Sequence, residues 1–215
     1  MKQFLIKNLP LFILDPYWDM KRRKINQELI SKWESKGKPV PPPHPIKQQR
    51  ILEYKQKFNL STLVETGTFQ GEMVEAQRKN FDQIYTIELS PDYYQKAVEK
   101  FKRFKHIHII EGDSSVKLKE VTKILKEPAL FWLDGHYSGG STAKGELNCP
   151  IYGELDTVFS STIDHVLVID DAKDFNGTED YPTIDALNKY VISKRPHYKM
   201  DVRDNIISFY PDKKK

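Results

Sequence analysis

Five short apolar runs recur along this chain, and a segment long enough for a helix separates each run from the next. Runs of this kind predict strands that are buried on both faces of a sheet. Parallel strands need crossover connections, which are usually helices, so the alternation indicates a parallel sheet with helices on both faces. The predicted strands cover residues 62–66, 83–89, 106–113, 129–134 and 165–171.

Amphipathic segments predict the helices of this fold. Residues 91–104 have a strong helix start, because Ser90 can cap the helix and Pro91 suits its first position. Residues 198–211 predict two antiparallel strands, since too few residues join them for a crossover. We therefore predict a doubly wound α/β fold with a mostly parallel, seven-stranded sheet. The other predicted helices cover residues 71–80, 115–126, 150–160 and 182–194.

Residues 1–58 differ from the rest, and we predict that they form a helical and proline-rich extension to a main domain at 59–215. The extension holds charged helical stretches at about 18–36 and the segment KPVPPPHP, whose prolines exclude a helix or central strand. Residues 46–58 predict a helix that leads into the main domain. We expect the extension either to cover a ligand pocket or to form a contact in a homo-oligomer.

Composition excludes several classes of protein. The chain of 215 residues is 39% hydrophobic, enough for a sizeable core. Its single cysteine, Cys149, allows no internal disulfide, which favours a reducing, cytoplasmic location. No run approaches the roughly 18–20 apolar residues of a membrane span. The net charge is only +4 and the basic clusters are short, so we expect no nucleic-acid partner.

Acidic residues stand at the end of each predicted strand. In a right-handed parallel α/β sheet these ends share one edge, where ligands bind in open α/β folds. We therefore predict an acidic ligand-binding edge. The alternative is that the acids cap the following helices, which would suit Asp113 but explains the glutamates poorly. The acids are Glu65, Glu88, Asp113, Asp134, Asp170 and Asp171.

The turn after the first strand, VETGTFQGEM, narrows the choice of ligand. Gly67 and Gly71 permit a close turn whose backbone N–H groups point at a ligand. The turn matches neither the dinucleotide fingerprint nor a P-loop, and Glu65 and Glu72 would repel a pyrophosphate. A cationic cofactor without phosphate fits better, and S-adenosylmethionine is one.

Each part of that cofactor has a candidate partner. Glu88 offers only acceptors, which suits the two ribose hydroxyls. Asp113 can accept a hydrogen bond from the adenine amino group. Glu65 and the backbone of Gly67 can hold the amino-acid end.

At this point four motifs resemble those of class I S-adenosylmethionine-dependent methyltransferases. They are LVETGTFQG, YTIELSPDYYQKA, IIEGDS and FWLDG, in the family's order and spacing. The first motif departs from the usual form, with G-T-F-Q-G where G-x-G is common. The resemblance implies a Rossmann-like methyltransferase fold. It also implies cofactor contacts from Glu65, Thr66, Gly67, Thr68, Gly71, Glu88, Leu89, Asp113, Ser114 and Asp134.

The fourth and fifth strands end in three aspartates, Asp134, Asp170 and Asp171. Converging carboxylates repel one another unless a cation joins them, and such oxygen-rich sites suit Mg²⁺ or Mn²⁺. This pattern resembles metal-dependent small-molecule O-methyltransferases of the catechol and macrocin types. That resemblance implies the three aspartates as metal ligands, and His136, together with Asp134, as catalytic. His136 follows Asp134 by two residues, whereas the macrocin type has three.

The predicted activity is methyl transfer from S-adenosylmethionine to a hydroxyl of a small molecule or sugar, with divalent-metal assistance. A sugar or polysaccharide precursor is the preferred acceptor, and a natural-product precursor is a further candidate. Two alternatives stay open: a metal-independent methyltransferase for another small acceptor, and a non-catalytic nucleoside-binding module of the same fold. The long loop that holds Lys144 and Glu146 is expected to be a lid or substrate loop.

Three further residues have competing interpretations. For His106 and His108, which alternate on a predicted strand, we favour a structural role. Cys149 precedes a predicted helix, and no base partner for a nucleophile is evident near it in the sequence.

Overall fold

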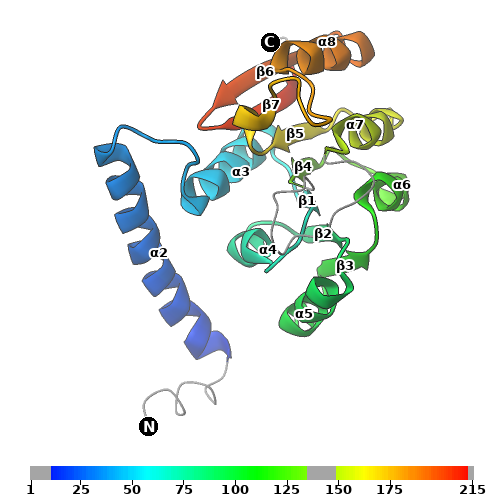
Figure 1. Cartoon of the computed structure of the whole chain (residues 1–215). Coiled ribbons are helices and arrows are strands. Elements are labelled where there is room, and N and C mark those ends of the chain that lie inside the picture. The colour runs from blue at the N-terminus through cyan, green and yellow to red at the C-terminus, as the bar shows by residue number, and fades with distance from the viewer. Residues whose placement is uncertain (1–10, 135–148, 213–215) are drawn as a thin grey trace. The chain divides into compact units, whose positions relative to one another are not determined.

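The computed structural model describes residues 11–134 and 149–212, with side chains from residue 16 onward. Seven strands form one sheet in the order β3-β2-β1-β4-β5-β7-β6 (Figure 1). Strands β1 to β5 are parallel, and β7 runs antiparallel to both β5 and β6. The predicted fold class is therefore confirmed. The strands are β1 Thr62–Thr66, β2 Gln83–Glu88, β3 Ile107–Glu111, β4 Leu130–Leu133, β5 Val166–Ile169, β6 Tyr198–Arg203 and β7 Ile206–Pro211.

Helices cover both faces of this sheet. Figure 1 shows α3, α4 and α5 on one face and α6, α7 and α8 on the other. Every helix predicted from the sequence is present, with shifted ends. The helices are α2 Leu11–Ser35, α3 His44–Phe58, α4 Glu72–Gln77, α5 Pro91–Phe101, α6 Ser114–Ile124, α7 Ile151–Phe159 and α8 Ile184–Lys194, with a 3₁₀ turn at Ala172–Asp174.

Local hydrogen bonds explain two of the shifted ends. The third strand stops at Glu111 rather than at residue 113, because Asp113 already accepts from the backbone N–H of Ser115 and starts α6. Helix α4 ends at Gln77, where the N–H of Asn80 bonds back to its carbonyl and turns the chain. The predicted cap of α5 is confirmed, since the Ser90 hydroxyl accepts from the N–H of Tyr93 at 3.5 Å.

Strand β4 shows why the apolar runs are continuous. All four of its side chains are buried, and they point alternately to the two faces. Leu130 and Trp132 join the core beneath α3, α4 and α5, whereas Phe131 and Leu133 join the core beneath α6, α7 and α8. A central strand therefore has no solvent face that would require polar residues.

The strand order reverses between β1 and β4. From β1 the chain proceeds outward to β2 and β3, then crosses back to place β4 on the other side of β1. In open α/β sheets this switch point opens a crevice at the carboxyl ends of the strands. The fold therefore places the ends of β1 and β4 at the position where a ligand is expected.

Residues Met1–Lys47 and Gln48–Lys215 form two compact units, so most of α3 belongs to the unit that contains the sheet. In the first unit α2 begins at Leu11, earlier than predicted, and contains Pro16. Beyond its end Gly37 has a φ of +78°, and the Trp33 indole donates to the carbonyl of Pro39 at 2.7 Å. None of the described helices combines the length and the apolar character needed to span a membrane.

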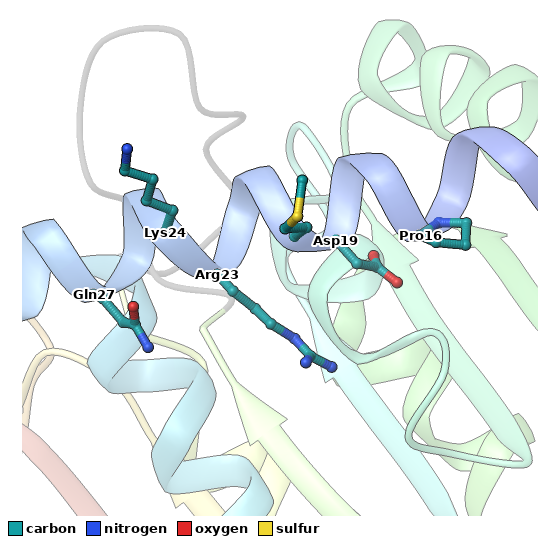
Figure 2. Close-up of a pocket in the computed structure, with 6 residues that line it drawn as sticks. Pro16, Asp19, Arg23, Lys24 and Gln27 are labelled. Carbon is teal, nitrogen blue, oxygen red and sulfur yellow. The ribbon is translucent and has the colours of Figure 1, made fainter.

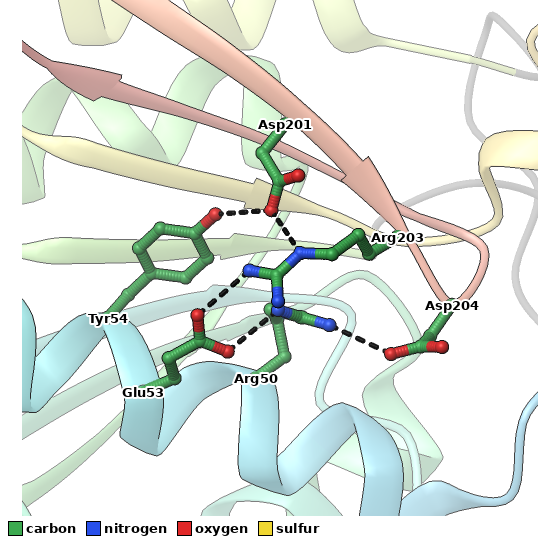
Figure 3. Close-up of polar contacts among 6 residues, drawn as sticks. All are labelled: Arg50, Glu53, Tyr54, Asp201, Arg203 and Asp204. Atoms are coloured by element: carbon green, nitrogen blue, oxygen red, sulfur yellow. Dashed lines mark hydrogen bonds and ion pairs between the residues drawn. The ribbon is translucent and has the colours of Figure 1, made fainter.

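A network of ion pairs fastens α3 to the β6–β7 hairpin (Figure 3). Arg50, whose side chain is 6% exposed, donates to Glu53 at 2.7 Å and to Asp204 at 2.8 Å. From β6, Arg203 donates to Glu53 at 2.8 Å and to Asp201 at 2.6 Å. The network therefore joins segments about 150 residues apart. Its members are Arg50, Glu53, Tyr54, Asp201, Arg203 and Asp204.

Replacing Arg50 by alanine should lower the free energy of unfolding by about 1–3 kcal/mol, because two charge-assisted hydrogen bonds are lost from a buried donor. Urea denaturation would measure the change. The control is Lys189→Ala, which removes an exposed pair with Asp185 within α8 and should leave stability nearly unchanged. Equal effects of the two substitutions would contradict a structural role for the network.

Candidate functional site

Two groups of acids lie at the carboxyl edge of the sheet, on either side of the switch point. Glu65 and Glu88 stand at the ends of β1 and β2, where they interact electrostatically. Asp134, Asp170 and Asp171 follow β4 and β5. The structure therefore brings the predicted acids to one edge of the sheet, as parallel pairing requires.

Glu88 holds the first loop against the second strand. One of its carboxylate oxygens accepts from the N–H of Phe69 at 2.6 Å, and the other accepts from the N–H of Ser90 at 2.8 Å. The side chain is 5% exposed. A carboxylate oxygen can accept two hydrogen bonds, so each retains the capacity to accept one from a ribose hydroxyl.

Glu65 ends a chain of hydroxyl groups. Its carboxylate accepts from Thr86 at 2.5 Å, and the Thr86 oxygen lies 2.5 Å from that of Thr68. In the bond between Thr86 and Thr68 either hydroxyl can be the donor. Thr66 lies on the same strand and accepts from the N–H of Asp134 at 3.2 Å. These bonds fix the ends of β1, β2 and β4 to one another.

Burial raises the pKa of Glu65 to about 8, and the nearby charge of Glu88 raises it further, while Thr86 and Lys100 oppose the shift. The Glu65 carboxyl therefore holds a proton at neutral pH. A cation placed beside it would favour the ionised form.

The turn between β1 and α4 has little room for larger residues. Gly71 has a φ of +66°, and a Cβ on it would lie 2.6 Å from the ring of Phe101. Phe69 also has a positive φ, and its ring packs against Tyr93 at 4.6 Å. Lys100 closes the turn by donating to the carbonyls of Gln70 and Gly71.

Most backbone N–H groups of this turn already have partners inside the protein. Those of Gly67 and Thr68 donate to the carbonyl of Ile87, and that of Gly71 donates to Thr68. The sequence suggested that such groups point at a ligand. In the structure the turn therefore offers a ligand its shape and the Glu88 carboxylate rather than a nest of free amides.

The three aspartates meet as predicted from the sequence. Asp134, Asp170 and Asp171 each contribute one carboxylate oxygen to a group within 4.8 Å, and Asp170 is fully buried. Three convergent carboxylates are a donor set for a hard divalent cation, so the residues present fit Mg²⁺ or Mn²⁺.

The turn after β5 determines the orientation of the Asp171 side chain. Its φ is +53°, a left-handed conformation that aspartate tolerates better than most residues. Asn205, between β6 and β7, donates to the Asp171 carboxylate at 3.1 Å. The ammonium of Lys173 lies 3.8 Å from that carboxylate and donates to Asp174. A protein cation therefore already borders the aspartates.

The remaining predicted cofactor residues lie beside these groups. Asp113 accepts from the N–H and the hydroxyl of Ser115, so it caps α6, as the alternative interpretation held. Leu89 is half-buried between Glu88 and the cap of α5. His136, Lys144 and Glu146 lie outside the described residues.

Three residues have the structural settings that we favoured. The imidazoles of His106 and His108 lie at hydrogen-bond distance from the Arg78 carbonyl and the Gln83 side chain. Burial raises the pKa of Cys149 to about 12, which disfavours a thiolate nucleophile. Sequence analysis missed Glu154, a fully buried acid on α7 that bonds Ser114. The pattern that could have identified Glu154 in the sequence is an acidic residue on the apolar face of a predicted helix.

A separate hollow of about 490 Å³ lies along α2 (Figure 2). The lining residues that the structure describes all come from that helix, and they mix Asp19 with Arg23 and Lys24. They present no convergent set of ligands. We therefore place the candidate site at the sheet edge and not here.

Replacing Glu65 by glutamine should change how stability depends on pH. Its pKa rises from 4.5 to about 8 on folding, so its favourable contribution is complete below pH 4.5 and is lost as the pH rises to about 8. Stability of the original chain relative to Glu65→Gln should therefore fall across this range. Urea unfolding at a series of pH values would show it, and Glu111→Gln, at an exposed strand end, is the control. Parallel curves for Glu65→Gln and the original chain would contradict the burial argument.

Comparison with known proteins identifies solved structures with a similar fold. No protein-family model and no curated protein sequence matches this chain. The methyltransferase PaMTH1 of Podospora anserina, bound to S-adenosylhomocysteine (SAH), has a TM-score of 0.55 at 16% identity. The comparison covers 86% of this chain and 87% of that chain. The O-methyltransferase of Bacillus cereus in complex with SAH has a TM-score of 0.57 at 14% identity, with 87% and 90% covered.

A third similar structure is an N-methyltransferase. The N-methyltransferase NodS of Bradyrhizobium japonicum WM9 has a TM-score of 0.52 at 11% identity, with 78% of this chain and 96% of that chain covered. At these identities the likeness concerns the path of the backbone. The chain therefore has the Rossmann-like, seven-stranded fold of these methyltransferases.

Proposed function

We propose that this protein is a methyltransferase that uses S-adenosylmethionine. The observation that carries the proposal is the pair of buried carboxyls at the ends of β1 and β2, beside the switch point of a methyltransferase fold. Glu88 has acceptor capacity for a ribose diol, and Glu65 is placed for a cationic group. A pyrophosphate cofactor would be repelled by the carboxylate of Glu88.

The aspartates after β4 and β5 support the acceptor half of the proposal. Asp134, Asp170 and Asp171 would hold a divalent ion, which would lower the pKa of an acceptor hydroxyl and orient it. Asp134 also bonds to Thr66 on β1, so the metal ligands and the cofactor contacts share one rigid edge. Such an edge favours a fixed geometry between donor and acceptor.

The reaction we propose is a single displacement. The acceptor oxygen forms a bond to the methyl carbon while the carbon–sulfur bond breaks, and the sulfur keeps the electron pair. His136 takes the acceptor proton and passes it to solvent, which suits an imidazole near neutral pH. The acceptor is a hydroxyl of a small molecule or a sugar, such as a polysaccharide or natural-product precursor.

Lys173 favours a second candidate, a methyltransferase that needs no metal. Its ammonium interacts with Asp170 and Asp171, so a side chain of the protein offsets part of their mutual repulsion. In that case the aspartates would bind the acceptor directly. Dependence on a divalent ion separates the two candidates.

Calorimetric titration tests which cofactor the protein binds. The protein should bind S-adenosylmethionine and S-adenosylhomocysteine (SAH) and should not bind NAD. Glu88→Ala should weaken SAH binding about tenfold or more, because the ribose hydroxyls lose a buried acceptor. The control is Glu111→Ala, at the exposed end of the neighbouring strand, which should bind normally. Preference for NAD, or equal losses in the two variants, would refute the proposed site.

Removal of divalent ions tests whether methyl transfer requires a metal. Methyl transfer to a hydroxylated acceptor should stop in the presence of EDTA and return with Mg²⁺ or Mn²⁺. Asp170→Asn should lose at least about a hundredfold in activity while retaining SAH binding, because only the acceptor side is damaged. Asp185→Asn, on the exposed face of α8, is the matched control. Full activity in EDTA would instead support the metal-independent candidate.

A further inference from the structure

Glu154 is a buried acid that the contacts proposed above do not use. It lies on α7 and has no solvent exposure, on the same helix face as Ile151, Leu155 and Val158 of the core. Burying a carboxyl among apolar side chains is unfavourable unless hydrogen bonds compensate for the lost water. A residue at this position therefore calls for a specific partner.

Its partner is the first residue of α6. The hydroxyl of Ser114 donates to one oxygen of Glu154 at 2.7 Å. Among the described residues, no donor lies within 3.5 Å of the other oxygen, Oε2, although the hydroxyl of Thr66 is close enough to act on the carboxyl. Burial raises the pKa of Glu154 to about 7, and the charge of Asp113 adds to this shift, while Ser114 and Thr66 oppose it. The carboxyl thus lies behind the turn between β3 and α6.

This bond decides what Ser114 can offer a ligand. A serine hydroxyl has one hydrogen, and here that hydrogen is directed at Glu154, so the oxygen can only accept. The Ser115 hydroxyl is likewise committed, because it donates to Asp113 at 2.7 Å. Asp113 and Ser114 are half-buried, so a ligand can reach them. Their side chains together present acceptors and no spare hydrogen.

Side chains that offer only acceptors can distinguish between purines. The 6-amino group of adenine donates hydrogen bonds, whereas at the same position the 6-oxo group of hypoxanthine only accepts them, and the donor of hypoxanthine is the N–H at the neighbouring N1. The acceptors therefore favour adenine where they face position 6 of the base. We propose that Glu154 is a positioning residue that holds Ser114 as an acceptor and thereby selects a 6-aminopurine over a 6-oxopurine. This inference rests on the proposed function, because it assumes that the adenine of the cofactor lies at this turn.

The test compares SAH with its deaminated form, S-inosylhomocysteine, in which the 6-amino donor becomes a 6-oxo acceptor and N1 becomes an N–H donor. Calorimetric titration of the full chain at a pH of about 8, above the pKa of Glu154, would give both affinities. The original protein should bind SAH about tenfold or more tightly, because the 6-oxo group would leave the acceptors of Asp113 and Ser114 covered by the base and unpaired.

The variants separate positioning from general damage. In Glu154→Ala the Ser114 hydroxyl is free to turn and donate to the 6-oxo group, so the preference should fall about fivefold. Glu154→Gln should retain the preference, because its amide oxygen can still accept from Ser114. Asp156→Ala removes a surface acid on the same helix and should change nothing. A purely structural loss would weaken both ligands equally and leave their ratio unchanged.

The outcomes are distinguishable. An unchanged preference in Glu154→Ala, or a loss of preference in Glu154→Gln, would overturn the role of Glu154. Failure of the original protein to bind either ligand would instead remove the proposed cofactor site. If circular dichroism shows that Glu154→Ala does not fold, Ser114→Ala gives the same test. It removes the acceptor itself, and an unchanged preference there would overturn the inference.

Discussion

Parallel strand pairing is the constraint on which the site depends. The register pairs Leu133 of β4 with Ile169 of β5, so the next residues, Asp134 and Asp170, emerge side by side. It also pairs Glu65 with Thr86, which lets the threonine hydroxyl reach the buried carboxyl. A shift of one residue in either pairing would turn these side chains to the opposite face of the sheet. The apolar side chains of β1, β4 and β5, which pack under helices on both faces, hold that register and hence the acids.

Gathering carboxyls at one edge has an electrostatic cost, and the fold meets it differently at each position. Glu88 is stabilised by two backbone N–H groups. Glu65 remains protonated at neutral pH, because burial and the neighbouring charge raise its pKa. Near Asp170 and Asp171 the ammonium of Lys173 supplies positive charge. The concentration of carboxyls at this edge is the physical basis for proposing a cationic methyl donor and a divalent ion.

The methyltransferase fold leaves the acceptor open. Solved structures with this backbone path include an O-methyltransferase and an N-methyltransferase, so the sheet alone does not choose the atom that is methylated. In this chain we propose that the aspartates after β4 and β5, together with His136, make that choice. Glu154 acts at the other end of the proposed site, where it affects recognition of the base rather than of the acceptor.

The sequence by itself determined the strands, the helices between them, the serine cap of α5 and the acids at the strand ends. These features depend on local periodicity and on residues a few positions apart, so they can be read along the chain. Only the tertiary structure decided that β7 lies between β5 and β6, that Lys173 borders the aspartates, and that the amides of the first turn are already bonded. It also revealed the bond from Ser114 to Glu154, which are 40 residues apart. Such contacts depend on where side chains point after distant segments have packed, and no local pattern records that.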